Sequence, residues 1–184
     1  TAMNNSSSLL LKIISDILDF SKIESEQLKI EPREFSPREV MNHISANYLP
    51  LVVRKQLGLY CFIEPDVPEQ MSGDPMRLQQ VISNLLSNAI KFTEQGSVTM
   101  GYQPVEGGLS FYVTDTGKGI SQEHLEQIFD RFTKLDSFIP GTGLGLSICQ
   151  LIVNKLGGRL SVESELGKGS TFRFTIACNP ASDL

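Results

Sequence analysis

Residues 74–115 read DPMRLQQVISNLLSNAIKFTEQGSVTMGYQPVEGGLSFYVTD, and their pattern indicates the fold class. Asp74-Pro75 is typical of a helix start, with an acidic N-cap residue followed by proline in the first turn. Two β-branched and aromatic runs follow at 97–103 and 109–114, separated by the hairpin-turn sequence Glu106-Gly107-Gly108. Between these signals, the three-and-four spacing of one apolar face predicts a helix as far as Thr93. The residues of that face are Leu78, Val81, Ile82, Leu85, Ala89 and Phe92.

The flanking sequence continues the mixture of helices and strands. Apolar residues at helical spacing from Leu9 to Leu28 predict a long helix, whose broad apolar stripe needs a partner helix. Strand-like 29–35 leads into Ser36-Pro37-Arg38-Glu39, a capping box that begins a helix running to Arg54. The remaining expected elements are strand 59–63, helix 121–129, irregular segment 130–142, helix 144–156, and strands 159–163 and 170–177.

This order of elements predicts an α+β fold. Helices and strands that first alternate and then form hairpins indicate a two-layer α/β sandwich, with one mixed sheet and helices on one face. One long helix precedes the sandwich.

The composition excludes several classes of protein. The chain has 184 residues, 40% of them hydrophobic and 20% charged, as in an ordinary globular domain. A net charge of -5 without basic clusters argues against binding to nucleic acid or acidic lipid. No apolar run approaches the roughly 18 residues of a membrane helix, and the first residues lack the pattern of a secretory signal. We therefore expect a cytosolic chain without direct membrane contact.

The three cysteines are expected to pack in the core and not to form disulfides or bind a metal. Cys61, Cys149 and Cys178 are odd in number, far apart and without the paired spacing of metal ligands. Neither a disulfide framework nor a zinc site is expected, and all three are interpreted as buried thiols.

A polar stripe borders the apolar face of the helix that begins at Asp74. Gln80, Asn84, Asn88 and Lys91 fall within about 80° of one another on a helical projection. Amide oxygens beside an ammonium group suit a magnesium ion and phosphates, because magnesium prefers oxygen ligands that it shares with nucleotides. A solvated helix face is the alternative interpretation of this stripe.

An acidic residue and a glycine turn end the second hairpin strand. In Val113-Thr114-Asp115-Thr116-Gly117-Lys118-Gly119-Ile120, a carboxylate at the strand end can accept a hydrogen bond from an exocyclic amine such as that of adenine. The glycines allow the backbone to approach a flat ligand. A purely structural turn explains the same residues equally well, since Asp and Gly favour any turn.

Two further segments add features of an anion site. A glycine-rich segment, Gly141-Thr142-Gly143-Leu144-Gly145-Leu146, begins a helix. Its exposed backbone N–H groups favour the binding of phosphate. The pattern alone is weak evidence, and it fits neither a P-loop nor a Rossmann unit. Phe129-Asp130-Arg131-Phe132-Thr133-Lys134 combines two aromatic anchors with two cations, as in a hinged flap. A loop with buried phenylalanines and exposed cations is the alternative for the second segment.

In this order and spacing, the segments resemble the N, G1, F and G2 boxes of the Bergerat-type ATP-binding domain of bacterial sensor histidine kinases. The matching ranges are 84–91, 115–119, 129–132 and 141–146. Any one segment is common, but four in order are highly specific. Residues 17–24, ILDFSKIE, are similar to the second helix of the dimerisation and phosphotransfer hairpin in hybrid sensor kinases. The resemblance implies part of that hairpin at 1–30, the catalytic ATP-binding domain at 31–180 and a tail at 181–184.

The resemblance also implies roles for individual residues, with ATP or ADP and Mg²⁺ as ligands. Asp115 would bind the adenine amine, with Ile120 and Leu146 as apolar walls and Thr171 near the base. Asn84 would hold magnesium. The remaining implied residues are Asn88 and Lys91 at the phosphates, Arg131 and Lys134 of an ATP lid at 131–141 facing the terminal phosphate, and the backbone of Gly117, Gly119, Gly141, Thr142, Gly143, Leu144 and Gly145.

The amide of Asn84 bears on the type of reaction. In the gyrase-like and chaperone ATPases that look similar, a glutamate at this position activates water, and an amide cannot act as that base. This favours phosphoryl transfer to another side chain, in which positioning and charge neutralisation supply most of the catalysis. A hydrolytic ATPase of the same superfamily and a non-catalytic nucleotide-sensing or docking module remain the alternatives.

The family's phosphoacceptor histidine is followed by an acidic residue and, about five positions on, by proline. His43 is followed by Ile44 with Pro50 too far away, and His124 is followed by Leu125, so neither fits. We therefore expect no catalytic residue of this kind in the chain. The resemblance implies, as partners, the dimerisation helices of the same kinase in a homodimer and a response-regulator receiver domain. It also implies that the chain is the cytoplasmic part of an inner-membrane sensor.

Overall fold

The computed structural model describes residues 10–11, 14–15, 17–18, 21–22, 28–130, 133 and 143–181. In this part of the chain, the main sheet has five strands in the order β2-β4-β5-β7-β6. β2 pairs with β4 in parallel and the other neighbours pair antiparallel, so the sheet is mixed, as predicted. The strands are β2 (Gly58–Ile63), β4 (Ser97–Val105), β5 (Gly108–Asp115), β6 (Leu160–Glu165) and β7 (Gly169–Ala177).

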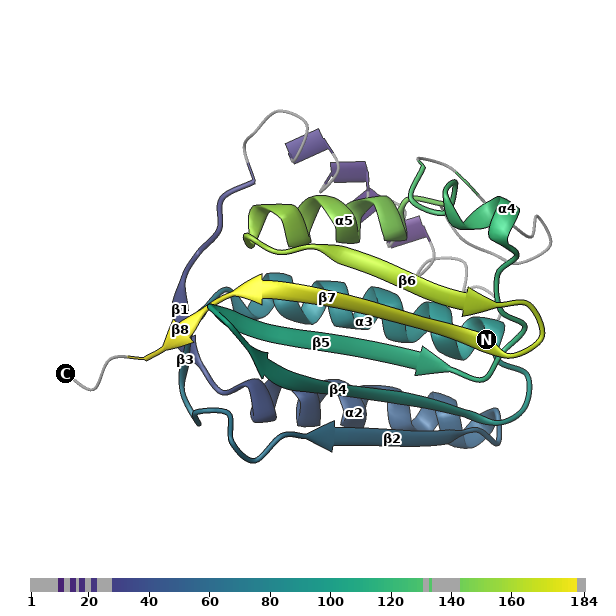
Figure 1. The fold of residues 1–184 in the computed structure, drawn as a ribbon, viewed down its shortest axis with the longest axis horizontal. Helices are drawn as coiled ribbons and strands as arrows, with labels where there is room; N and C mark the ends of the chain where they lie inside the picture. Colours follow the sequence, from purple (N-terminus) through teal and green to yellow (C-terminus); the bar gives the residue numbers. More distant parts are fainter. Residues whose placement is uncertain are drawn as a thin grey trace.

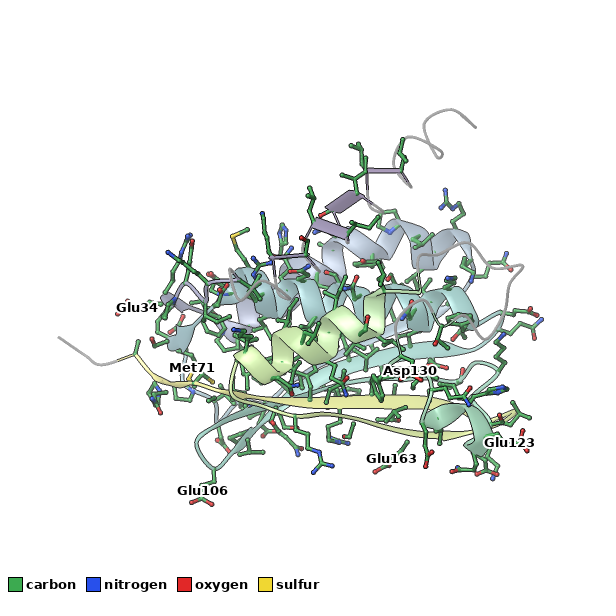
Figure 2. All side chains as sticks on the ribbon, turned by 90° about the horizontal axis from the view of Figure 1, so that it is seen from above. Glu34, Met71, Glu106, Glu123, Asp130 and Glu163 are labelled. Carbon is green, nitrogen blue, oxygen red and sulfur yellow. The ribbon has the colours of Figure 1, made fainter. Side chains whose placement is uncertain are left out.

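Three helices cover one face of this sheet. α2 (Pro37–Arg54), α3 (Pro75–Phe92) and α5 (Gly145–Lys155) lie side by side behind the strands in Figure 1, and Figure 2 shows them all on the same side. No helix of the described chain covers the opposite, open face. The core lies between the two layers, where the rings of Phe111 and Phe174 from neighbouring strands stack with centroids 5.3 Å apart.

α3 is the central helix of the core. Its apolar stripe supplies seven buried side chains, which pack between the sheet and the other two helices. The ammonium group of Lys55 donates to the carbonyl oxygens of Ile90 at 2.6 Å and Thr93 at 3.0 Å, which stabilises the negative end of the helix dipole. The buried residues of α3 are Leu78, Val81, Ile82, Leu85, Leu86, Ala89 and Ile90.

A small second sheet holds the start of α3, and the sequence did not predict it. β3 (Met71–Gly73) lies between β1 (Arg33–Phe35) and β8 (Asn179–Pro180), with antiparallel pairing on both sides. The buried carboxylate of Asp74 accepts from the N–H of Arg77 at 3.0 Å, as the predicted N-cap. Its second oxygen accepts from the N–H of Glu31 at 2.9 Å. Asp74 therefore joins the incoming chain to the first turn of α3.

Three sequence-based expectations need correction. The strand-like segment 29–35 forms a strand only over β1, because β3 offers just three residues for pairing. The expected helix 121–129 ends early as α4 (Gln122–Leu125), and tighter turns follow, with Gln127 N–H donating to the carbonyl of His124. Cys61 is only half-buried, since it lies on the edge strand β2, whereas Cys149 and Cys178 are buried as predicted.

The predicted N-terminal helix lies partly outside the described residues. Its described pairs, 10–11, 14–15, 17–18 and 21–22, are helical. Large apolar side chains on them are exposed, for example Leu10, Ile14 and Ile17. A continuous helix over 9–28 stays a prediction.

Candidate functional site

The site lies at one end of the sheet. There, the end of β5, the end of α3, the start of α5 and the short helix α4 come together (Figure 1). The first two of these elements place the predicted carboxylate and the predicted polar stripe.

Asp115 is the last residue of β5, and only 7% of its surface is exposed. One carboxylate oxygen accepts from the N–H of Gly117 at 2.9 Å. Burial raises the pKa of Asp115 above its ordinary value, while backbone hydrogen bonds from Gly117 and Ser170 act in the opposite direction. A buried carboxylate that keeps accepting capacity is suited to bind a donor group of a ligand.

The glycine turn after Asp115 is packed too closely for side chains. A Cβ at Gly117 would overlap the carbonyl oxygen of Phe92, and one at Gly119 would overlap the carbonyl oxygen of Glu165. Gly119 also has a φ of +69°, which disfavours any residue with a Cβ. The turn is therefore fixed between the end of α3 and the connection from β6 to β7.

The polar stripe of α3 lies at the rim of the core, as expected. Asn84, Asn88 and Lys91 are each half-buried. The fourth member of the stripe, Gln80, accepts from the guanidinium of Arg77 at 2.8 Å.

A second lysine, not identified from the sequence, lies near the end of this stripe. The ammonium groups of Lys91 and Lys118 both lie 5.1 Å from the ring centroid of Phe92. Two positive charges therefore gather around one aromatic ring where α3 ends.

The start of α5 supplies the described part of the glycine-rich segment. Gly143 has a φ of +70°, and the buried Leu144 occupies the N-cap position without a side-chain cap hydrogen bond. Gly145 has open space where a Cβ would stand, and Leu146 packs half-buried against the core. The predicted site residues Arg131, Lys134, Gly141 and Thr142, and all of the predicted lid except Thr133, lie outside the described residues.

The structure does not bring Thr171 to the face of the sheet where Asp115 lies. Its hydroxyl is 3.0 Å from that of Thr114, its cross-strand partner. It is also paired with Glu163, whose side chain projects from the open face in Figure 2. Side chains alternate between the faces of a strand, so the side chain of Thr171 lies on the opposite face from that of Asp115.

The neighbouring Ser170 lies on the same face as Asp115. It is the cross-strand partner of Asp115, is 7% exposed and shares its face. Sequence reasoning did not identify Ser170, because the face on which each side chain lies follows only from the pairing of β7 with β5.

Ile120, the other predicted apolar wall, is half-buried and packs against the core. Its N–H donates to the hydroxyl of Ser164 on β6 at 2.8 Å. Ile120 is therefore positioned by a residue of a distant strand.

Comparison with known families agrees with this geometry. Residues 73–180 match the model of the histidine kinase-, DNA gyrase B-, and HSP90-like ATPase family. The chain belongs to this family of ATPases.

Individual relatives are sensor kinases. The chain is 66% identical over 180 residues to the sensor histidine kinase RcsC of Escherichia coli, covering 96% of the chain and 19% of RcsC. It is 40% identical over 182 residues to the hybrid signal transduction histidine kinase B of Dictyostelium discoideum, covering 94% of the chain and 9% of that protein. The chain thus spans about a fifth or less of the length of these relatives.

Solved structures of the same family share the fold. Full-length ShkA in complex with AMPPNP superposes with a TM-score of 0.89 at 28% identity, covering 99% of this chain and 38% of ShkA. The catalytic domain of the histidine kinase ThkA has a TM-score of 0.71 at 28% identity, covering 80% of this chain and 95% of the domain. The predicted two-layer Bergerat fold and the predicted ATP-binding catalytic region of a sensor histidine kinase are confirmed. Among the described helices of this family member, none is long and apolar enough to cross a membrane.

Replacing Asp115 tests whether its carboxylate binds the base of a nucleotide. We predict that Asp115→Asn lowers the affinity for ATP by ~10-fold or more, because the amide can present a donor where the amine needs a charged acceptor. Calorimetric titration measures the change. Asp66→Asn, an exposed position in the loop after β2, is the matched control and should bind as the unaltered chain does. Unchanged affinity in a folded Asp115→Asn protein would exclude Asp115 from the site.

Proposed function

We propose that this chain binds ATP with Mg²⁺ and transfers the γ-phosphoryl group to a histidine on a dimerisation helix. The buried carboxylate of Asp115, at the same end of the sheet as the polar edge of α3, is the observation that supports this most strongly. A carboxylate on one side and amides with lysines on the other match a molecule with an amine at one end and phosphates at the other.

The base would lie against Asp115. Its exocyclic amine would donate to the carboxylate, with Ile120 and Leu146 packing against the ring as apolar walls. Ser170 takes the place that the sequence assigned to Thr171, and it would contact the base directly or through one water. The backbone of Gly117 and Gly119 would lie close to the ligand.

The phosphates would lie along the polar edge of α3. Asn84 would hold Mg²⁺ through its amide oxygen, and Asn88 and Lys91 would contact phosphate oxygens. Among the described residues, no group of three or more His, Cys, Asp and Glu side chains gathers to hold a metal. Because Mg²⁺ shares oxygen ligands with nucleotide phosphates, the ion would take further ligands from phosphate and water. The further proposed contacts are Arg131, Lys134, Gly141, Thr142, Gly143, Leu144 and Gly145.

A residue of the same helix favours transfer of the phosphoryl group to a side chain over hydrolysis of ATP. Asn84 is an amide and cannot remove a proton from water, so the described edge of α3 lacks a base at that position. Positioning and neutralisation of phosphate charge are the contributions that Asn88 and Lys91 can make.

Neither histidine of the chain fits the role of acceptor. His43 is exposed on α2, within the ATP-binding domain. His124 is exposed on α4, and its Nδ1 lies 2.8 Å from the hydroxyl of Ser121. The acceptor would be supplied by the dimerisation helices of the same kinase, in a homodimer that passes the phosphoryl group to a response-regulator receiver domain. The whole protein would be an inner-membrane sensor with this region in the cytoplasm.

Replacing Asn84 tests the magnesium assignment. We predict that Asn84→Ala weakens binding of ATP in the presence of Mg²⁺ while leaving metal-free adenosine binding almost intact, because the amide serves the metal and not the base. Titrations of both ligands measure this, with the exposed Asn47→Ala on α2 as the matched control. Equal losses for ATP and adenosine would indicate a folding defect and contradict the assignment.

Labelling with γ-labelled ATP tests the proposed transfer. We expect no label on the chain alone and label on a supplied dimerisation hairpin that carries the acceptor histidine, provided that the hairpin docks. Acid and base treatment of the products identifies the bond, since phosphohistidine is labile to acid and stable to base. Such a label on His43 or His124 would contradict the assignment of the acceptor.

A further inference from the structure

The hydroxyl of Ser164 on β6 connects three segments of the adenine end of the site. It lies 2.8 Å from the carbonyl oxygen of Gly169 and 2.8 Å from the hydroxyl of Ser170, both on β7. It also accepts from the N–H of Ile120 at 2.8 Å, which is the residue proposed as an apolar wall. Ser164 itself is half-buried and follows Leu160 and Val162 on the inner face of its strand.

Counting hydrogens fixes the direction of these bonds. A serine hydroxyl has one hydrogen and two lone pairs. The carbonyl of Gly169 can only accept, so the single hydrogen of Ser164 points to it. If that hydrogen pointed to Ser170 instead, two oxygen lone pairs would face each other at 2.8 Å. The hydrogen between the two serines therefore comes from Ser170, and the lone pairs of Ser164 are used by Ser170 and Ile120.

This direction determines what Ser170 can offer to a ligand. With its only hydrogen donated to Ser164, the Ser170 hydroxyl presents acceptors alone. Ser170 is the cross-strand partner of Asp115, on the same buried face. The base therefore meets two neighbouring acceptors, a carboxylate and a hydroxyl. An exocyclic amine, with two N–H groups, satisfies both, whereas a carbonyl oxygen in the same place faces two acceptors and satisfies neither.

We propose that Ser164 is a specificity-determining positioning residue, which orients the Ser170 hydroxyl so that the site accepts a 6-amino purine and rejects a 6-keto purine. The proposal rests on the proposed function, because it requires that the base lie against Asp115. Ser164 acts through Ser170 and does not contact the ligand. Without Ser164, the Ser170 hydroxyl rotates and donates to a carbonyl as readily as it accepts from an amine.

The experiment compares the affinities for ATP and inosine triphosphate, which has a carbonyl in place of the amine. Displacement of a fluorescent ATP analogue, in the presence of Mg²⁺, measures both affinities for each variant. We expect Ser164→Ala to lower the preference for ATP over inosine triphosphate by about fivefold, the effect of one hydrogen bond of ordinary strength. Ser161→Ala is the matched control. Ser161 lies on the same strand, but its hydroxyl donates to the Arg173 carbonyl on the exposed side, and the preference should stay unchanged.

A double-mutant cycle tests whether Ser164 acts through Ser170. Ser170→Ala should lower the preference by itself, and adding Ser164→Ala should then lower it no further. Equal losses of both nucleotides in Ser164→Ala would show a merely structural role and overturn the proposal. An additional loss of preference in the double variant would also overturn it.

Two further results distinguish a wrong role for Ser164 from a misfolded variant and from a wrong proposed function. If Ser164→Ala does not unfold cooperatively on heating, the variant is not properly folded and Ser170→Ala alone tests the proposal. An unchanged preference for ATP over inosine triphosphate in Ser170→Ala then overturns the proposal. Failure of the unaltered chain to bind ATP at all would contradict the proposed function itself, and the inference with it.

Discussion

A single helix both fills the core and forms one wall of the site, and this double use constrains the rest of the structure. α3 buries seven apolar side chains against the sheet and its neighbouring helices, so its rotation about its own axis is fixed by packing. Asn84, Asn88 and Lys91 then lie at the rim, because they border the apolar stripe. The ends of α3 are held by Asp74 at the start and Lys55 at the end. Any movement of these ends would shift the polar edge relative to the sheet.

Asp115 differs from the polar residues at the rim of α3, because its carboxylate must carry a charge at a buried position. Burial disfavours the charged form and raises the pKa of the carboxyl, while backbone hydrogen bonds from Gly117 and Ser170 stabilise the charge. The glycines make this possible, because a side chain at Gly117 or Gly119 would overlap neighbouring backbone. The result is a buried acceptor at the strand end that is hydrogen-bonded to the backbone of the turn.

Local signals predicted much of the fold and of the site. The capping residues Ser36 and Asp74 begin helices where expected, and Asp115 ends its strand as the sequence indicated. The small sheet of β1, β3 and β8 was missed because its strands are short and come from distant parts of the chain. Ser170 was missed because a one-residue difference reverses the face of a strand, and only the pairing of β5 with β7 shows that Ser170 shares the face of Asp115. No sequence pattern identified Ser164, since its proposed role depends on contacts with two other segments.

We propose that the end of the sheet around Asp115 and α3 is an ATP site suited to transfer of the phosphoryl group and not to hydrolysis. Calorimetric titration of the unaltered chain with ATP and Mg²⁺, followed by measurement of released phosphate in the same sample, tests it most directly. We expect saturable binding of one nucleotide per chain with negligible release of phosphate. Absence of binding, or continuous release of phosphate by the chain alone, would contradict it.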